Sequence, residues 1–599
     1  MEDRNTTIPR ANAISDVVFE RVLDYIHDSR DRQSISLVCR RLYELESHSR
    51  KHVSIPQCYT ATPKQLLRRF PFLESVKLKG QPRTQLVRST LPDCWGGFAT
   101  PWVEEFSKSF GCLKAVHFRR MVVKDEDLEL LARERGGVLE VLKLDICSGF
   151  STDGLAHISR SCRKLKVLFL EGSLVVEKDG DWLHELAINN TQLETLNFYF
   201  TKLSLVSSND LELIAERCKS LKSVKISDCE RLDLDEFFYL AGSLEEFRGN
   251  GFHKFVELYP PLPSAEFDPP FPPGLCRLGP NGIDIIEIYL VGRLASRLKQ
   301  LDFLYTYLDT DDQCMLLEDC HNLEVLETGL ALGDPGMEVV ANCCKKLKRI
   351  RIEPRPGGEW WEGLVPDEDE DEDEEPERVV TQRGLTAIAQ GCLDLEYICV
   401  FASNITNAAL ESIGTNLKKL RDFRIVLLAT EEVNKDFPLD SGIRSLLSGC
   451  NNLRRLSLSL RPGGLTDVGL TYIGQHSPNI KCMQLQDAGE SDAGLLGFSK
   501  GCPSLRKLQL TGCCFSEKAL AMAVLQLRSL RYLWVEEYMG YKTGSDLLAM
   551  ARPFWNIEIM PPSEVLWFEK PANILAYYSL AGPRTDYPSY VSLLDSIAQ

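Results

Sequence analysis

The chain has 599 residues, and its 69 basic and 86 acidic side chains give a net charge of −17 at neutral pH. This length exceeds what one hydrophobic core supports, so the sequence predicts several domains or a solenoid of repeats. The excess of negative charge disfavours general binding to nucleic acids or anionic membranes. The sequence shows no long apolar run and no apolar leader, so we expect an intracellular chain whose 20 cysteines are reduced.

Residues 14–56 form the first predicted unit, because their apolar side chains follow helical spacing and carry no repeat. Asp16, the Asp31-Arg32 step and the run from Ser36 to Arg41 resemble an F-box. That resemblance implies apolar docking into a Skp-type adaptor and, through it, a cullin ubiquitin ligase. The docking residues would be Val22, Leu23, Ile26, Leu37, Val38 and Cys39. A helical cap over the first repeat is the alternative, and both roles are compatible. Residues 1–13 are expected to be disordered.

Residues 57–565 repeat one phrase with a period of about 25 residues. A helix-like stretch, with Thr152, Thr466 or Ser491 suited to its N-cap, precedes a Cys-x-x-Leu turn and a Leu-x-x-Leu-x-Leu strand. The phrase predicts an α/β leucine-rich-repeat solenoid, a closed horseshoe with parallel strands inside and helices outside. The turn cysteines are Cys162, Cys218, Cys320, Cys344, Cys392, Cys450 and Cys502.

We interpret these cysteines as small buried turn residues, because zinc-type Cys-x-x-Cys pairs are absent from the sequence and no metal is expected. The acidic run Asp367–Glu377 interrupts the repeats and predicts a solvated loop over about 364–380. Residues 566–599 are expected to form a C-terminal cap.

Residues between the strand leucines should face the inner surface of the solenoid. Many of them are basic, which predicts a concentration of positive charge suited to a polyphosphate. They are Lys77, Lys79, His117, Arg119, Arg349, Arg351, Arg424, Arg455 and Lys507. A solvated strand face is the alternative, although an unneutralised cluster of like charge would destabilise the fold. Tyr397, Cys399, Phe401, Tyr532 and Trp534 could wall an apolar pocket on the same surface.

Several phrases are similar to the plant F-box hormone receptors, and above all to their coronatine-insensitive, or jasmonate receptor, branch. Among them are Asp422–Leu428, Gly463–Asp467, Tyr472–Asn479 and Ala576–Gly582. The resemblance implies that jasmonoyl-isoleucine binds in the inner pocket and is covered by a jasmonate-ZIM-domain repressor, which is then ubiquitinated. It also implies an inositol polyphosphate of the pentakisphosphate type, bound by Lys79, Arg83, Arg120, Arg349, Arg351, Arg424 and Lys507.

The same resemblance implies a hormone site made of Arg83, Val87, Arg351, Cys399, Val400, Phe401, Arg424, Ser459, Gln484 and Trp534. Arg83, Arg351 and Arg424 would hold the hormone's carboxyl and amide oxygens, since a planar guanidinium suits that contact. The chain departs from the family pattern at Val87, Phe401, Ser459, Gln484 and Thr511. A related oxylipin, or a client recognised without any hormone, therefore stays open.

An enzymatic activity of the chain itself is not expected, because the sequence carries no phosphate-binding loop, metalloprotease motif or nucleophile elbow. Ubiquitin transfer would belong to the partner ligase. The nucleus, with the cytoplasm as a second site, is the expected location, and this follows only from the family's nuclear repressors.

Overall fold

The computed structural model describes residues 15–26, 28–58, 61–80, 97–227, 232–249, 271–283, 285–354, 379–428, 436–536, 556–559, 574–576 and 591–593. The chain divides into two compact units, residues 1–190 and residues 191–599. The predictions for residues 1–13, Arg83, Val87 and the acidic run Asp367–Glu377 lie outside the described residues. Most of the predicted C-terminal cap lies outside them as well.

The first unit begins with three helices that confirm the predicted helical module. They are α1 (Asp16–Asp24), α2 (Ser29–Ser36) and α3 (Arg40–Ser49). The carboxylate of Glu46 on α3 is completely buried and accepts hydrogen bonds from Arg50 Nε at 2.6 Å and Arg69 Nη2 at 2.5 Å. Arg69 ends α4 (Pro63–Arg69), the first helix of the repeats, and its guanidinium lies 3.8 Å from the ring of Tyr43. Charge and ring contacts thus join the helical module to the first repeat.

The rest of the first unit alternates strands and helices. Its strands pair in parallel, in the order β1 (His52–Ile55), β2 (Ser75–Lys79), β3 (Ala115–Arg119), β4 (Val141–Asp145) and β6 (Val167–Phe169). The helices between them are α5 (Thr100–Ser109), α6 (Asp125–Arg135), α7 (Thr152–Ser161) and α8 (Asp181–Asn189). A separate two-stranded sheet joins β5 (Ser148–Ser151) to β7 (Leu174–Val176).

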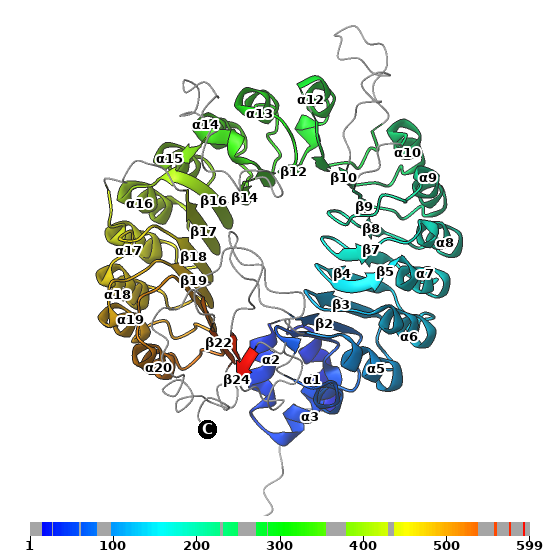
Figure 1. The fold of residues 1–599 in the computed structure, drawn as a ribbon, viewed down its shortest axis with the longest axis horizontal. Coiled ribbons are helices and arrows are strands. Elements are labelled where there is room, and N and C mark those ends of the chain that lie inside the picture. Colours follow the sequence, from blue (N-terminus) through cyan, green and yellow to red (C-terminus); the bar gives the residue numbers. More distant parts are fainter. Residues whose placement is uncertain are drawn as a thin grey trace, which may run out of the picture. The chain divides into compact units, whose positions relative to one another are not determined.

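The second unit continues the same alternation, with strands on one side of the chain and helices on the other (Figure 1). Its strands are β8 (Thr195–Asn197), β9 (Ser223–Lys225), β10 (Glu246–Gly249), β11 (Arg277–Pro280), β12 (Gln300–Phe303), β13 (Val325–Thr328), β14 (Arg349–Ile352), β15 (Val380–Thr381), β16 (Tyr397–Asn404), β17 (Asp422–Leu427), β18 (Arg455–Ser459), β19 (Cys482–Gln486), β20 (Lys507–Thr511), β21 (Tyr532–Glu536), β22 (Asn556–Ile559), β23 (Ile574–Ala576) and β24 (Val591–Leu593). Among the described strands, only β22 and β23 pair antiparallel.

The helices of this unit are α9 (Ser208–Arg217), α10 (Leu234–Leu240), α12 (Ile285–Gly292), α13 (Thr310–Leu317), α14 (Gly333–Cys343), α15 (Gln382–Gly391), α16 (Asn407–Asn416), α17 (Asp440–Gly449), α18 (Asp467–His476), α19 (Asp492–Ser499) and α20 (Glu517–Gln526), with short 3-10 turns η2 (Ala295–Arg297) and η3 (Leu330–Leu332). In the part of the chain that the structure describes, we find no helix with the length and apolar character needed to cross a bilayer. The parallel strands and alternating helices confirm the predicted leucine-rich-repeat class.

The core forms because equivalent apolar residues of successive strands stand side by side. Leu326 of β13 lies beside Ile350 of β14, and Ile350 beside Ile398 of β16, all at most 1% exposed. The turn cysteines lie in the same core, which confirms their predicted burial. Burial raises the pKa of the Cys162 and Cys502 thiols to about 12, so both stay protonated at neutral pH. These cysteines are structural and not nucleophilic.

In several repeats, an aspartate near the start of one helix accepts hydrogen bonds from the Ser or Thr at the N-cap of the next helix. Asp467 begins α18, and its carboxylate accepts from the backbone N–H of Glu490 at 2.9 Å and from the N–H and hydroxyl of Ser491. The same Ser491 hydroxyl accepts from Ala493 N–H as the N-cap of α19. Equivalent pairs join Asp125 to Ser151, Asp334 to Thr381, Asp440 to Thr466 and Asp492 to Ser516. Ser151, and not the predicted Thr152, caps α7.

We expect Asp467→Ala to destabilise the protein by about 1 kcal/mol, because two backbone N–H groups and an N-cap hydroxyl lose their acceptor. Hydrogen bonds from Ser491 and its neighbours outweigh burial and lower the pKa of Asp467. Its stabilising effect is therefore present above the unfolded pKa and is lost as the pH falls through the folded one. Melting temperatures recorded at several pH values measure the loss of stability in Asp467→Ala and its dependence on pH. Asp319→Ala, at an exposed aspartate, is the control. Equal melting temperatures of the two variants would contradict the stabilising role of Asp467.

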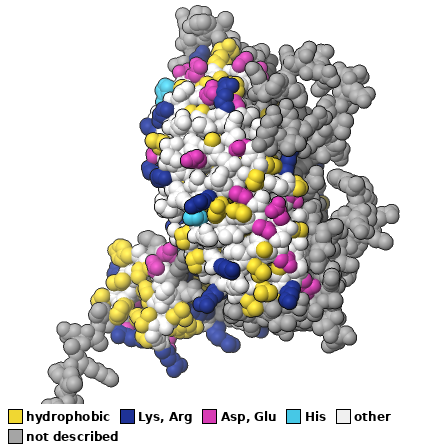
Figure 2. Space-filling model, turned by 90° about the vertical axis from the view of Figure 1, so that its left-hand side faces the viewer, with side chains coloured by type: hydrophobic (Ala, Val, Ile, Leu, Met, Phe, Trp, Pro, Cys, Tyr) yellow, Lys and Arg dark blue, Asp and Glu magenta, His cyan; other side chains and the backbone are white. Residues whose placement is uncertain are grey.

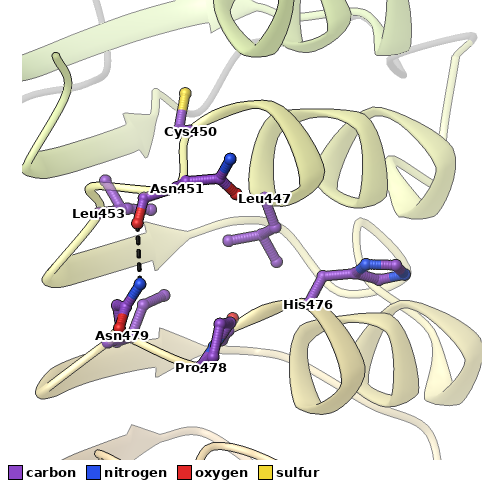
Figure 3. Close-up of a pocket in the computed structure, with 9 residues that line it drawn as sticks. Leu447, Cys450, Asn451, Leu453, His476, Pro478 and Asn479 are labelled. Carbon is purple, nitrogen blue, oxygen red and sulfur yellow. Dashed lines mark hydrogen bonds between the residues drawn. The ribbon is translucent and has the colours of Figure 1, made fainter. Parts of the chain in front are cut away.

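One turn departs from the cysteine pattern. Ser477 stands where neighbouring repeats carry Cys450 and Cys502; its hydroxyl is buried without a hydrogen-bond partner among the described residues. The thiol of Cys450, in contrast, donates to the carbonyl of Leu417 at 3.5 Å. A hollow of about 10 Å³ lies beside Ser477, between two successive turns (Figure 3). The side-chain amide of Asn479 in one turn donates a hydrogen bond to the backbone carbonyl of Asn451 in the other at 3.0 Å. This space suits about one water molecule and excludes a hormone-sized ligand.

We expect Ser477→Cys to stabilise the protein by about 0.5–1 kcal/mol, because the larger sulfur fills the hollow and restores the turn pattern. Ser220→Cys places the same change at an exposed position of another turn and serves as the control. The measurement is thermal melting under reducing conditions. A lower melting temperature for Ser477→Cys than for the wild type would contradict this expectation and indicate that the hydroxyl holds a water there.

Candidate functional site

The side chains that point away from the core form rows across the strands of the second unit. Strand register places Arg351 of β14 beside Cys399 of β16, and Cys399 beside Arg424 of β17. The same row continues through Ser457, Gln484, Gln509 and Trp534. A neighbouring row on the same face runs through Phe401, Val426, Ser459, Gln486 and Thr511. Most hormone-site residues predicted for this unit therefore share one face.

Val400 is the exception, and its predicted ligand contact is corrected. It stands between Cys399 and Phe401 on β16, so its side chain points to the opposite side of the sheet. Register puts it beside Ile352 and Ile425, and it is 0% exposed. Val400 belongs to the hydrophobic core.

Each of the two site arginines of the second unit is paired with a carboxylate two residues away on its own chain segment. Arg424 donates from Nε to Asp422 Oδ1 and from Nη2 to Asp422 Oδ2, both at 2.9 Å. Arg351 donates to the Glu353 carboxylate, which also accepts from the Cys399 thiol at 3.2 Å. Burial opposes the charge of both arginines, yet these hydrogen bonds raise the pKa of each above its usual value. Both guanidiniums stay charged at every physiological pH.

Tyr397 lies between two of the basic side chains. The Arg349 guanidinium stands 3.8 Å from the centre of its ring, and that of Arg424 stands 5.4 Å away. Burial, only partly opposed by the two arginines, raises the pKa of the Tyr397 phenol, which therefore remains protonated at neutral pH. The ring stacks with both cations and separates their charges.

In the second unit, acidic side chains on the same face partly neutralise the predicted concentration of positive charge. Arg349 Nε lies 3.3 Å from Glu327 Oε1, and Arg455 Nη1 lies 3.6 Å from Asp422 Oδ2. Arg248 of β10, 8% exposed, pairs with the buried Asp302. Glu327 lies next to Arg351 in the strand register, and Asp422 lies next to Arg455 in the register and two positions before Arg424 in the sequence. Sequence reasoning missed them because it counted only the basic members of each strand.

Toward β18–β20 the two rows carry uncharged polar side chains, while Lys507 adds a positive charge on the same face. The Ser459 hydroxyl donates to the Gln486 side-chain oxygen. Thr511 is 3% exposed, and its hydroxyl has no hydrogen-bond partner among the described residues. Phe401 and Trp534 are 3% and 1% exposed, so neighbouring atoms cover both aromatic rings. Lys507, predicted to bind polyphosphate, lies 5.1 Å from the ring of Tyr532.

The first unit carries a second basic group. Lys77, Lys79, His117, Arg119 and Lys143 share one face of β2, β3 and β4, and Arg120 follows β3 directly. Asp145 is the acid among them, 3.1 Å from Arg119 Nε and 3.3 Å from His117 Nε2. Burial, reinforced by the charge of Arg119, lowers the pKa of Lys77. Of the residues predicted for polyphosphate in this unit, Lys79 and Arg120 thus lie together.

The helical module exposes an apolar surface. Val22, Tyr25, Leu37 and Val38 are 50%, 80%, 78% and 71% exposed. Apolar side chains gather on the lobe at the lower left of Figure 2, at the height at which α1–α3 lie near the foot of Figure 1. Cys39 is exposed and Ile26 is half-buried. The predicted adaptor contact of Leu23 is corrected, because Leu23 is 2% exposed and forms part of the module's own core.

None of the described residues gathers three His, Cys, Asp or Glu side chains into a possible metal site. The site as described consists of paired arginines, aromatic rings and neutral polar groups. Such a surface can bind an anion and a partly apolar molecule beside it.

Comparison with known proteins shows the relationships of the chain. Residues 11–52 match the F-box family, and residues 71–118 match the family described as the Transport inhibitor response 1 protein domain. The chain is 52% identical over 591 residues to Coronatine-insensitive protein 1 of Arabidopsis thaliana, with 97% of each chain covered. It is 49% identical to Coronatine-insensitive protein homolog 1b of Oryza sativa subsp. japonica, covering 98% of this chain and 97% of the relative. GRR1-like protein 1 of Arabidopsis thaliana is 33% identical, with 96% of each chain covered.

Burial is the main cause that lowers the pKa of His117 in the folded protein. The unfolded chain therefore binds a proton at this histidine more readily than the folded protein does. We expect the free energy of unfolding to decrease as the pH drops below about 6.5, the ordinary pKa of histidine. His117→Gln should flatten this dependence. The measurement is the melting temperature from about pH 7.5 to about pH 5.5. His157→Gln is the control, and an unchanged slope in His117→Gln would contradict the expectation.

Proposed function

This chain belongs to the coronatine-insensitive family of F-box leucine-rich-repeat proteins, and we propose that it is the substrate-recognition subunit of a Skp–cullin–F-box ubiquitin ligase. In this role it is a jasmonate-type co-receptor: jasmonoyl-isoleucine or a related oxylipin binds on the inner strand face, and a jasmonate-ZIM-domain repressor covers it. The repressor is then ubiquitinated by the partner ligase and degraded. The chain itself supplies binding surfaces and no catalytic group.

The observation that carries this proposal is the row Arg351–Cys399–Arg424. Two charged guanidiniums stand on either side of a small thiol, and the ring of Tyr397 lies beside them. A carboxylate with an apolar body fits such a surface, because its charge meets planar donors while the body lies on aromatic and aliphatic side chains. Jasmonoyl-isoleucine has this chemistry.

The exposed apolar surface of α1–α3 supports the adaptor role. Isolated monomers seldom expose side chains such as Leu37 and Val38 next to one another at 78% and 71%. Burying these side chains against an adaptor gains hydrophobic free energy, at roughly 25 cal/mol per Å² of apolar area. The contact between Glu46 and Arg69 would keep the adaptor at a constant angle to the first repeats.

Inositol polyphosphate is the proposed cofactor. The family resemblance assigns its binding to Lys79, Arg120, Arg349, Arg351, Arg424 and Lys507, and to Arg83, which lies outside the described residues. Multiple phosphates offer enough charge to compete with the acidic partners of these side chains. The proposed location is the nucleus, where the repressors of the family act.

A hormone-independent F-box adaptor is the second candidate. It is favoured by the ion pairs that already neutralise Arg351 and Arg424, and by the neutral polar groups at Ser459, Gln484 and Thr511. Such an adaptor would recognise its client on another surface. Its client binding would therefore survive a charge reversal at the two arginines.

We expect the complex with its Skp-type adaptor to capture a jasmonate-ZIM-domain degron peptide only when coronatine or jasmonoyl-isoleucine is present. Arg351→Glu and Arg424→Glu should each abolish that capture, because a carboxylate would then face the ligand's anion. Arg383→Glu reverses an arginine that is 62% exposed and pairs with Glu338, and should leave capture intact. Pull-down measures all three. Ligand-independent capture, or capture that survives both reversals, would favour the hormone-independent adaptor.

We expect the double change Leu37→Glu and Val38→Glu to abolish co-purification with the adaptor, because two charges would be buried at the interface. Leu174→Glu is the matched control at a leucine that is 63% exposed on β7. Size-exclusion chromatography of the co-expressed proteins measures the complex. An intact complex with the double variant would show that the adaptor binds elsewhere.

A further inference from the structure

Two carboxylates in the second unit stand in mirrored positions about Cys399. Asp422 precedes Arg424 by two residues on β17, and Glu353 follows Arg351 by two residues just beyond the end of β14. Residues two apart on a strand share a face, so each acid reaches the arginine of its own segment. The register then places both arginines beside the one thiol.

The Asp422 contact is a side-on pair with defined geometry. It uses Nε and Nη2 of Arg424 and both oxygens of Asp422, each at 2.9 Å, and so fixes the plane of the guanidinium. Nη1 of Arg424 has no hydrogen-bond partner among the described residues. The side chains of Asp422 and Arg424 are only 12% and 15% exposed, so neighbouring atoms also restrict their motion.

Glu353 holds the other arginine from the opposite side. Its carboxylate accepts from Arg351 Nη2 and from the Cys399 thiol, and its backbone N–H donates to the carbonyl of Thr328 on β13. Nε and Nη1 of Arg351 have no hydrogen-bond partner among the described residues. Burial is the main cause that raises the pKa of Cys399 to about 12, so the thiol keeps its proton and adds no charge to the row.

We propose that Asp422 and Glu353 are positioning residues, which hold the guanidiniums of Arg424 and Arg351 so that their remaining N–H groups receive a ligand carboxylate above Cys399. The identity of that ligand rests on the proposed function. A long arginine side chain loses rotamer freedom when it binds an anion, and an arginine already held by a carboxylate has lost that freedom before the ligand arrives. The two acids therefore increase affinity for the anionic form of the ligand.

The opposite role of such carboxylates is competition, in which they occupy the arginines until a ligand displaces them. The two roles predict opposite changes in ligand affinity when the carboxylate is removed. Removing a competing charge strengthens binding, whereas removing a positioning charge weakens it. The side-on geometry of Asp422 favours positioning, since it leaves Nη1 and the second hydrogen of Nη2 outside the pair.

The first test compares coronatine with its neutral methyl ester in degron capture by the adaptor complex. We expect Asp422→Asn to raise the half-maximal concentration of coronatine about tenfold and to change that of the ester little. Glu353→Gln should act in the same direction, and Asp422→Glu should restore part of the loss. A merely structural defect would shift acid and ester alike. An unchanged or lower value for coronatine in Asp422→Asn would overturn the proposal.

Matched controls come from exposed ion pairs of the same kind. Asp394→Asn removes the partner of Lys419, and Glu338→Gln removes the partner of Arg383. Both ion pairs are about half exposed. The two control variants should therefore leave the ratio of the half-maximal concentrations of coronatine and its methyl ester unchanged. If the controls change this ratio as much as the site variants do, the effect is not specific and the proposal fails.

A second test does not depend on hormone or degron. Phenylglyoxal modifies arginines, and mass spectrometry gives the rate at each site in the adaptor complex. We expect Arg424 to react several-fold faster in Asp422→Asn than in the wild type, while Arg421, paired with Glu396 at the surface, serves as the internal reference. Equal rates at Arg424 would overturn the positioning role. Faster modification together with no ligand-dependent capture by the wild type would refute the proposed function and leave the positioning role standing.

Discussion

The parallel register of the strands is the constraint on which the rest of the structure depends. Each strand places its apolar residues beside those of its neighbours, as Leu326, Ile350 and Ile398 do, and the buried area stabilises the stack. Because side chains alternate along a strand, the same register places Arg351, Cys399 and Arg424 side by side on the other face. The core therefore determines where the site residues lie, and a shift of one residue would remove them from that face.

The repeats are also joined by polar contacts outside the strands. The aspartate that begins one helix accepts hydrogen bonds from the N-cap of the next, as Asp467 does from Ser491. The contact satisfies backbone N–H groups that a helix start leaves unpaired. It therefore fixes the spacing of helices on the outer side while the strand register fixes the inner side.

Charge on the strand face of the second unit is balanced and not simply positive. Glu327, Glu353 and Asp422 each form an ion pair with one of the arginines Arg349, Arg351 and Arg424. This arrangement lowers the cost of folding a face rich in arginine, since each partly buried charge is paired. It also means that recognition of an anion depends on how the acids orient the guanidiniums.

The sequence by itself determined the class of fold, the helical module and the buried role of the turn cysteines. Each follows from a local period or motif, such as Cys-x-x-Leu, that can be recognised from neighbouring residues alone. It also placed Arg351 and Arg424 on one face, because alternation along a strand is a local rule.

Only the tertiary structure decided which residues meet across strands. Glu327 lies beside Arg351 in the register and 3.3 Å from the guanidinium of Arg349, although more than twenty residues separate it from either in the chain. The core position of Val400 and the burial of Leu23 likewise follow from packing against neighbouring elements. A period states which way a side chain points, but charge neutralisation and burial depend on the neighbours that the fold brings beside it.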